Sequence, residues 1–406
     1  AISSCCATQQ LLIAGGGIAA MAAAWAVARA GWEVRVYERT PVFAEVGAGL
    51  QLGPNATRIL HAWGLADDLR AVAAYPERLQ VRSAVSGAEL GLLTLGGRAE
   101  ARYGAPYVTI HRADLHALLA RACALSGRVQ VNLGQTVSGF RDQGLAVQAR
   151  VGPNVIEGDA LLGADGLLST VRAQLLGDGP PQAIGDLAYR GAFDMGQLPP
   201  ALRANQVTIW LGPGLHVVHY PVRRGEALNV VAILRGHVPA RGDDLDEPAR
   251  AQAELERALA HSCAPLRDLV AGAAQAGLND RPWRRWVLAA RPPVVGAGQM
   301  ARGLVALAGD AAHPMRPYMA QGAGMAIEDA AELAHALAMD PIIDVPTRLK
   351  RYALARWQRC ARVQERSRRN GEVFHARGLV RVGRDASIRL LGERLLDVPW
   401  LYGHGA

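Results

Sequence analysis

The chain begins with a pattern of apolar and small residues that predicts a parallel βαβ unit. Leu11–Ala14 is a short apolar run, and after a cluster of glycines an alanine-rich stretch extends from Ile18 to Ala30. The segment Glu33–Tyr37 then alternates valine with polar residues. This order predicts a strand, a tight turn, a helix and a second strand. A unit of this kind requires a parallel sheet.

The middle of the chain carries a different pattern, with short β-like runs between about residues 186 and 236. The clearest runs are Gln206–Leu211, Leu215–Pro221 and Leu228–Leu234. Their alternation of apolar and polar positions predicts an antiparallel sheet. A helical pattern follows at about residues 246–260.

The last third returns to the first pattern. Gly303–Ala308 predicts another buried strand and Gly322–Ala338 a helix, and residues 346–406 are arginine-rich and mostly helical in pattern. The two kinds of pattern therefore interleave along the chain, so the domains cannot be separated by single cuts.

Composition narrows the class of protein. The 406 residues carry a net charge of +8, but the arginines are spread along the chain, so we expect no nucleic-acid partner. No apolar run is long enough for a membrane span. The five cysteines have no metal-ligand spacing and the histidines are scattered. We therefore expect no metal, and a reducing, cytoplasmic setting.

The first chemical motif is Gly15-x-Gly17-x-x-Ala20. Its first glycine allows a tight turn, its second lets the backbone approach a pyrophosphate, and Ala20 allows close packing of helix and strand. The helix N-terminus that follows favours phosphate. Glu38, at the end of the second strand, has the position of an acidic residue that accepts hydrogen bonds from a ribose. Together these features predict a dinucleotide site.

Two further motifs follow predicted strands. Gly309-Asp310 comes directly after the predicted strand Gly303–Ala308. Ligands of parallel sheets bind at the carboxyl ends of the strands, so this motif is placed to bind one. Gly322-Ala323-Gly324 then opens a helix whose dipole favours negative charge. Asp165-Gly166 is the third motif, and alone it indicates only a turn.

In this order and spacing the three motifs resemble the group A FAD-dependent aromatic hydroxylases, which have the para-hydroxybenzoate hydroxylase fold. The resemblance spans residues 10–402 and includes the segments Gly47–Ala56, His111–Leu115 and Gly309–Ala330. Within the group the chain looks most like the salicylate, 3-hydroxybenzoate and 6-hydroxynicotinate hydroxylases.

The resemblance implies an α/β fold in which an FAD-binding, Rossmann-like domain of the glutathione-reductase type interleaves with an antiparallel-sheet substrate domain, followed by a helical C-terminus. The expected FAD-binding parts are residues 10–80, 106–182 and 286–345. The expected substrate parts are residues 81–105 and 183–285, and residues 346–406 form the C-terminal region.

The resemblance also implies the residues of the cofactor site. Those expected to bind FAD tightly but non-covalently are Gly15, Gly17, Ala20, Glu38, Arg39, Gly49, Arg112, Asp165, Asp310, Gly322, Ala323 and Gly324. Asp165 is also expected to support transient binding of NADH or NADPH, for which the chain has no second glycine motif. Pro317 is expected beside the isoalloxazine ring.

The implied reaction is hydroxylation of a small phenolic or hydroxylated aromatic acid, using NAD(P)H and O2 through a flavin C4a-hydroperoxide. This chemistry needs an electron-rich ring, so a base near the phenol is useful. His216 and Tyr220 share one face of the predicted strand Leu215–Pro221 and match an active-site pair of the 3-hydroxybenzoate 6-hydroxylases. Gln51 and Arg316 are candidate substrate contacts, Arg316 as a partner for a carboxylate.

Two alternatives remain open at this point. One is a quinone-pathway hydroxylase or epoxidase with a larger substrate, and the other is a non-catalytic flavoprotein. A homodimer also remains open. The spacing of Trp283 and Trp286 and the position of Lys350 disfavour a flavin-dependent halogenase.

Overall fold

A six-stranded sheet lies at the centre of the nucleotide-binding half of this computed structural model, which describes residues 8–43, 48–236, 248–273, 276–278 and 283–405. The strand order is β17-β18-β11-β1-β2-β7. The strands are β1 Gln10–Ala14, β2 Glu33–Glu38, β7 Val129–Leu133, β11 Ala160–Gly163, β17 Ala301–Arg302 and β18 Val305–Leu307. β1 pairs in parallel with β2 and β11, and β11 pairs in parallel with β18. The predicted parallel sheet is therefore confirmed.

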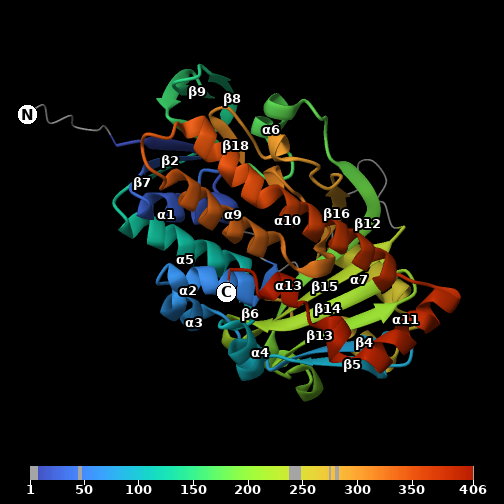
Figure 1. Cartoon of the computed structure of the whole chain (residues 1–406). Coiled ribbons are helices and arrows are strands. Elements are labelled where there is room, and N and C mark those ends of the chain that lie inside the picture. Colours follow the sequence, from blue (N-terminus) through green and yellow to red (C-terminus); the bar gives the residue numbers. More distant parts are fainter. Residues whose placement is uncertain (1–7, 44–47, 237–247, 274–275, 279–282, 406) are drawn as a thin grey trace, which may run out of the picture.

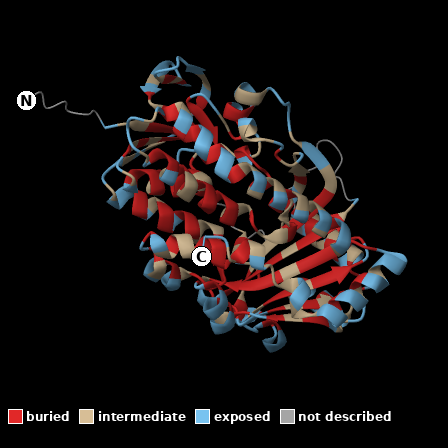
Figure 2. Cartoon of the chain, in the orientation of Figure 1, coloured by how far each residue is buried: buried red, intermediate tan, exposed pale blue. Residues whose placement is uncertain are grey.

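The turn after β1 depends on glycine. Gly15 has φ +99°, and a Cβ placed on it would lie 2.4 Å from the carbonyl oxygen of Ala164. Helix α1, Ile18–Arg29, follows and is lined with buried alanines. These small side chains let α1 pack closely against α9, Gly322–Leu337, and α5, Arg112–Leu125. Figure 2 shows that α1 and α9 are largely buried.

A seven-stranded sheet forms the other half of the molecule, in the order β16-β12-β15-β14-β13-β4-β5. Its strands are β4 Arg78–Ser83, β5 Glu89–Thr94, β12 Gln182–Asp194, β13 Gln206–Gly212, β14 Leu215–Val222, β15 Ala227–Arg235 and β16 Arg284–Ala290. The expected antiparallel pairing of β13, β14 and β15 is confirmed. β4 enters from far earlier in the chain and pairs with β13 in parallel.

The two faces of this larger sheet pack against different parts of the molecule. One face packs on α7, Pro248–Ala258, and α8, Ala264–Ala273, through an apolar cluster that includes Phe193 and Trp283. The opposite face carries His216, Val218 and Tyr220 by the alternation of β14. That face is turned toward the nucleotide-binding half, since Tyr220 belongs to the same apolar cluster as β1 and α1.

Smaller elements connect the two halves. The two-stranded antiparallel sheet of β3, Gly49–Leu52, and β6, Val108–His111, contacts α9 on one side and β14 on the other. Helix α2, Pro54–Ala62, packs on β3 and contacts α3, Ala66–Val72, and α4, Gly96–Tyr103. A three-stranded sheet, β8 Val137–Asp142, β9 Val147–Val151 and β10 Asn154–Gly158, lies beside α6, Thr170–Leu176 (Figure 1).

The predicted C-terminal helices are present. The long helix α10, Val345–Phe374, runs across both halves, and α11 Gly378–Leu391, α12 Glu393–Leu396 and α13 Pro399–Tyr402 follow it (Figure 1). The strand expected at Gly303–Ala308 is shorter, because Gly303 has φ +56° in the turn between β17 and β18. Among the described helices none has the length and apolar composition needed to cross a bilayer. Gly47 lies outside the described residues.

Candidate active site

The three sequence motifs meet at one edge of the parallel sheet. Gly15 follows β1, Asp165 comes soon after β11, and Gly309 comes soon after β18. Backbone hydrogen bonds join these three strand ends, from Ala164 N to Ala14 O at 2.9 Å and from Ala308 N to Gly163 O at 3.0 Å. Motifs separated by more than a hundred residues therefore form one continuous backbone surface.

Glu38 lies directly against the glycine turn. Its carboxylate accepts hydrogen bonds from Gly16 N at 2.6 Å and from Thr40 N at 2.8 Å. The side chain thus reaches the same turn as the predicted pyrophosphate-binding glycines, and its placement suits a hydroxyl-bearing sugar.

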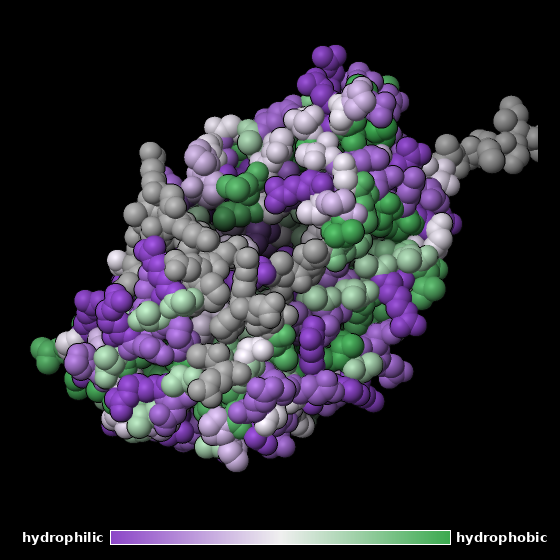
Figure 3. Space-filling model, turned by 180° about the vertical axis from the view of Figure 1, so that it is seen from behind, coloured by the Kyte–Doolittle hydropathy of each residue, from purple (hydrophilic) through white to green (hydrophobic). Residues whose placement is uncertain are grey.

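Two long helices point open N-termini into this region. The N-cap residues of α1 and α9, Gly17 and Gln321, make no side-chain capping hydrogen bond. A Cβ on Gly322 would have nothing within 4 Å, and one on Gly17 would meet only Arg112 at 3.9 Å. Open N–H groups, positive dipole ends and free space favour anionic groups. Seen from behind, the molecule is hollowed near its centre, with hydrophilic surface in the hollow (Figure 3). These residues therefore fit FAD.

Asp310 and Asp165 differ in what their carboxylates do. Asp310 is exposed and follows β18. Asp165 instead accepts hydrogen bonds from the Ser169 hydroxyl, from Thr170 N at 2.8 Å and from Val171 N at 3.2 Å. Its carboxylate therefore holds the start of α6, and a direct bond from Asp165 to a cofactor would have to compete with these contacts.

The structure also identifies an anchor of the cofactor loops that the sequence did not single out. Arg172 is buried and donates to the carbonyl oxygens of Ala311 at 3.0 Å and Ala312 at 2.5 Å. The same side chain pairs with Asp178 at 2.6 Å. Arg172 thus ties the Asp165 segment to the loop that carries Asp310.

On the substrate side, His216 is fully enclosed. Its Nδ1 lies 2.8 Å from Nε2 of His375, and its ring packs 5.3 Å from the rings of Tyr318 and Phe374. Within the described part of the chain, its Nε2 has no hydrogen-bond partner. Burial, and next the neighbouring His375, lower the pKa of His216 well below its ordinary value. His216 is therefore neutral at neutral pH. It does not change its charge near neutrality, as an ordinary histidine does. A neutral ring can accept a proton.

Tyr220 lies beside the start of β3. Burial raises the pKa of its hydroxyl, and the nearby Arg190 and Gln51 side chains oppose that shift. Gln51 accepts a hydrogen bond from Tyr107 at 2.7 Å. A Cβ on Gly49 would lie 2.6 Å from the Tyr220 ring, so only glycine permits this close approach. Gly49 thus allows the Tyr220 ring to pack directly on the backbone of β3.

Arg190 is a further residue of this face that sequence analysis missed. It pairs with Val231 on β15, which pairs with Val218 on β14, so Arg190 lies on the same face as His216. Its Nε is buried without a hydrogen-bond partner in the described structure. Burial lowers the pKa of its guanidinium. The charge of Arg112 lowers this pKa further, and the charge of Asp310 raises it. A buried guanidinium N–H without an acceptor is costly, and an anionic ligand would compensate it.

Pro317 and Arg316 belong to the loop before α9. Pro317 is half-buried and precedes Tyr318, which stacks near His216. Arg316 lines a cavity of about 300 Å³ together with Arg291, Gln364 and Arg368. None of His216, Tyr220 or Gln51 lines that cavity. The structure therefore does not bring Arg316 together with the other predicted substrate residues.

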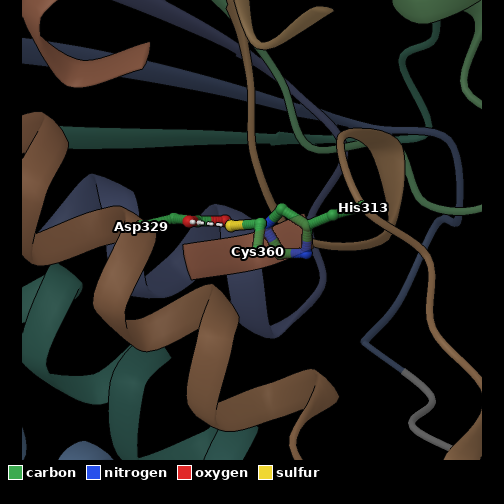
Figure 4. Close-up of side chains that lie close together, drawn as sticks. All are labelled: His313, Asp329 and Cys360. Carbon is green, nitrogen blue, oxygen red and sulfur yellow. Dashed lines mark hydrogen bonds and ion pairs between the residues drawn. The ribbon is translucent and has the colours of Figure 1, made fainter. Parts of the chain in front are cut away.

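Behind the Asp310 loop lies a buried group of His313, Asp329 and Cys360 (Figure 4). Asp329 bonds His313 Nε2 at 2.5 Å, Gly309 N at 2.9 Å and Arg356 Nε at 2.8 Å. Burial opposes the charged form of His313, but the Asp329 carboxylate outweighs it and holds the pKa of His313 well above its ordinary value. Because a guanidinium and a protonated imidazole already neutralise Asp329, we interpret this cluster as support for the loop.

Comparison with known proteins agrees with this geometry. A family model described as FAD binding domain matches residues 8–184 and 284–367. The chain is 36% identical over 398 residues to 3-hydroxybenzoate 6-hydroxylase of Polaromonas naphthalenivorans (strain CJ2), covering 97% of this chain and 95% of that protein. The chain belongs to the FAD-dependent aromatic monooxygenases.

One further relative supports the assignment, and one solved structure shares the fold. 6-Hydroxynicotinate 3-monooxygenase of Bordetella bronchiseptica (strain ATCC BAA-588 / NCTC 13252 / RB50) is 34% identical, over 89% of this chain and 91% of its own. The structure of Klebsiella pneumoniae HpxO complexed with FAD and uric acid shares the fold, with a TM-score of 0.82 at 24% identity over 96% of this chain and 94% of that one. The family resemblance, the fold class, the FAD cofactor and the assignment as an enzyme are therefore confirmed.

The exposed Asp310 carboxylate provides a clean test of the cofactor site. Asp310→Ala removes a charged acceptor but no core packing, so we expect FAD to dissociate with a Kd about 10- to 100-fold higher. Thermal unfolding of the apoprotein should stay within about 0.5 kcal/mol of wild type. Fluorescence titration of apoprotein with FAD measures the effect, and Asp67→Ala, an exposed carboxylate of α3, is the control. Equal Kd values for both variants would remove Asp310 from the site.

Proposed function

We propose that this monooxygenase hydroxylates a small phenolic or hydroxylated aromatic acid of the salicylate or 3-hydroxybenzoate class, with NADH or NADPH as transient reductant and O2 as oxidant. The observation that carries the proposal is the grouping of neutral His216, Tyr220 and the unpaired Nε of Arg190 on one sheet face. A phenol and a carboxylate on one small ring would satisfy all three. Two relatives, 3-hydroxybenzoate 6-hydroxylase and 6-hydroxynicotinate 3-monooxygenase, are named for hydroxylated aromatic acids.

Arg190 is the proposed carboxylate anchor. Its guanidinium lies on the face that holds His216, whereas Arg316 lines a different cavity. A planar guanidinium suits bidentate binding of a carboxylate. The ring plane of the substrate would then be fixed between Arg190 and the two phenol-binding side chains.

His216 is the proposed base, and Tyr220 the proposed hydrogen-bond partner of the phenol. Nε2 of His216 would accept the phenolic proton as the ring reacts, because electron density from the phenolate activates the ring for electrophilic attack. Gln51 would orient the Tyr220 hydroxyl. The enclosing side chains exclude water, and this strengthens each of these polar contacts.

FAD, when bound, supplies hydride acceptance and oxygen activation. Its proposed partners are the ones expected from the sequence, namely Gly15, Gly17, Ala20, Glu38, Arg39, Gly49, Arg112, Asp310, Gly322, Ala323 and Gly324, with Pro317 at the ring. Asp165 would act by holding α6 against the glycine turn.

A panel of hydroxybenzoates and hydroxypyridines tests the function. The protein should oxidise NADH or NADPH faster in the presence of a hydroxybenzoate and release a product heavier by one oxygen atom, identified by mass. A panel that yields no hydroxylated product from any acid would refute the proposed substrate class.

Arg190→Gln tests the carboxylate anchor. Removing a charged hydrogen bond should raise KM for the acid about 10- to 100-fold. The matched comparison uses the carboxamide of the same acid, whose KM should change little because it carries no charge. If the variant raises KM for acid and amide equally, Arg190 has a structural role instead.

A further inference from the structure

His216 is in hydrogen-bond contact with a second imidazole, which has no part in the reaction proposed above. His375 follows α10 and places Nε2 at 2.8 Å from Nδ1 of His216. The two residues are separated by 159 positions, and a backbone bond from Gly214 N to His375 O at 3.2 Å holds their segments together. The contact is enclosed, since both rings are buried at 2% exposure. A direct bond between two imidazoles permits a proton to pass from one ring to the other.

The surroundings of the two rings differ in charge. His216 is packed against Tyr318 and Phe374, and among the described residues no carboxylate stabilises a positive charge on it. Burial lowers the pKa of His375 to about 4, and the negative charge of Asp186 on β12 offsets only part of that effect. Asp186 also accepts from the Tyr318 hydroxyl and lies 3.7 Å from Arg235. Arg235, Arg377 and Arg384 oppose a charge on His375.

We propose that His375 is a positioning residue that receives the substrate proton through His216, an inference that rests on the proposed role of His216. Before transfer, His216 carries its proton on Nδ1 and donates it to Nε2 of His375. As the phenolic O–H breaks, Nε2 of His216 gains that proton, and the Nδ1 proton moves to Nε2 of His375. The phenolate and one imidazolium result, with the positive charge on the ring that faces Asp186. The transfer conserves protons and needs no other reactant.

The arrangement also fixes the tautomer of His216. A ring that donates from Nδ1 must present a bare Nε2, which is the form that accepts a proton from substrate. The described residues offer Nε2 no competing donor. His375 therefore serves both to orient the base and to remove the charge from it.

The variant His375→Gln separates this role from packing. A glutamine amide reaches the position of Nε2 and keeps a hydrogen bond to His216, but it cannot take up a proton. We expect FAD content, the rate of flavin reduction and KM to match wild type, while the hydroxylation rate at neutral pH falls about 10- to 100-fold. NAD(P)H consumption should continue with release of H2O2. The control His335→Gln replaces an exposed histidine of α9 and should behave as wild type.

The pH profile gives the decisive readout. In His375→Gln, product yield should recover only as pH approaches the range in which a phenol ionises unaided, about 10. Yield and profile equal to wild type would overturn the role of His375. A yield lost at every pH would also overturn it, because the defect would then be structural. If the wild-type protein hydroxylates none of the acids, the proposed function fails first. If His216→Asn loses yield and His375→Gln keeps it, only the inference on His375 fails.

Discussion

His216→Asn should abolish productive coupling while leaving the flavin functional. Asparagine places an amide near the position of Nδ1 and keeps a bond to His375, but it presents nothing at the position of Nε2. Loss of a general base typically slows the dependent step by about 10²–10⁴-fold. The ratio of hydroxylated product to NAD(P)H consumed should therefore approach zero, with the balance appearing as H2O2.

A second variant, Tyr220→Phe, tests the neighbouring hydroxyl. The ring that packs on Gly49 survives and only the hydroxyl near Gln51 is lost, so we expect a milder fall in the same ratio. Stopped-flow measurement of flavin reduction should give wild-type rates in both variants. Full coupling in both would mean that this strand face is structural and that the substrate binds elsewhere.

The cofactor half was predictable because its signals are local in sequence. The turn at Gly15 needs a glycine for its positive φ, the buried face of α1 needs small residues, and Glu38 follows at a fixed strand length. The same holds for the face shared by His216 and Tyr220, since the two-residue period of a strand places them without further information.

The residues that complete the proposed site were not predictable, because their contacts cross the fold. Arg190 reaches the substrate face only through the register of three strands, and an arginine in a β-like run has no distinguishing pattern. His375 follows a long arginine-rich helix and meets His216 only in three dimensions. Arg172 follows the Asp165-Gly166 motif by a few residues, yet its bonds to Ala311 and Ala312 depend on two distant segments meeting in the fold.

The network behind the Asp310 loop leads to the largest expected loss of stability. Arg356 donates to Glu328 at 2.7 Å and to Asp329 at 2.8 Å, and all three side chains are buried at 2% exposure or less. Arg356→Met keeps the volume but leaves both carboxylates without this cation. Breaking a buried pair on one side typically costs about 3–5 kcal/mol. The lower part of that range is expected, since Arg359 and His313 still pair with the two acids.

Urea unfolding of the FAD-bound enzyme measures the loss in free energy of unfolding. The control is Arg366→Met, which replaces an exposed arginine of the same helix and should change that free energy by less than about 0.5 kcal/mol. The double variant Arg356→Met with Asp329→Asn tests the cause. If an uncompensated charge is responsible, neutralising Asp329 should recover part of the stability, so the two changes will not be additive. FAD affinity should fall with Arg356→Met as well, because Asp329 holds Gly309 N at the start of the cofactor loop. Strictly additive losses would show that the cost comes from packing and not from charge.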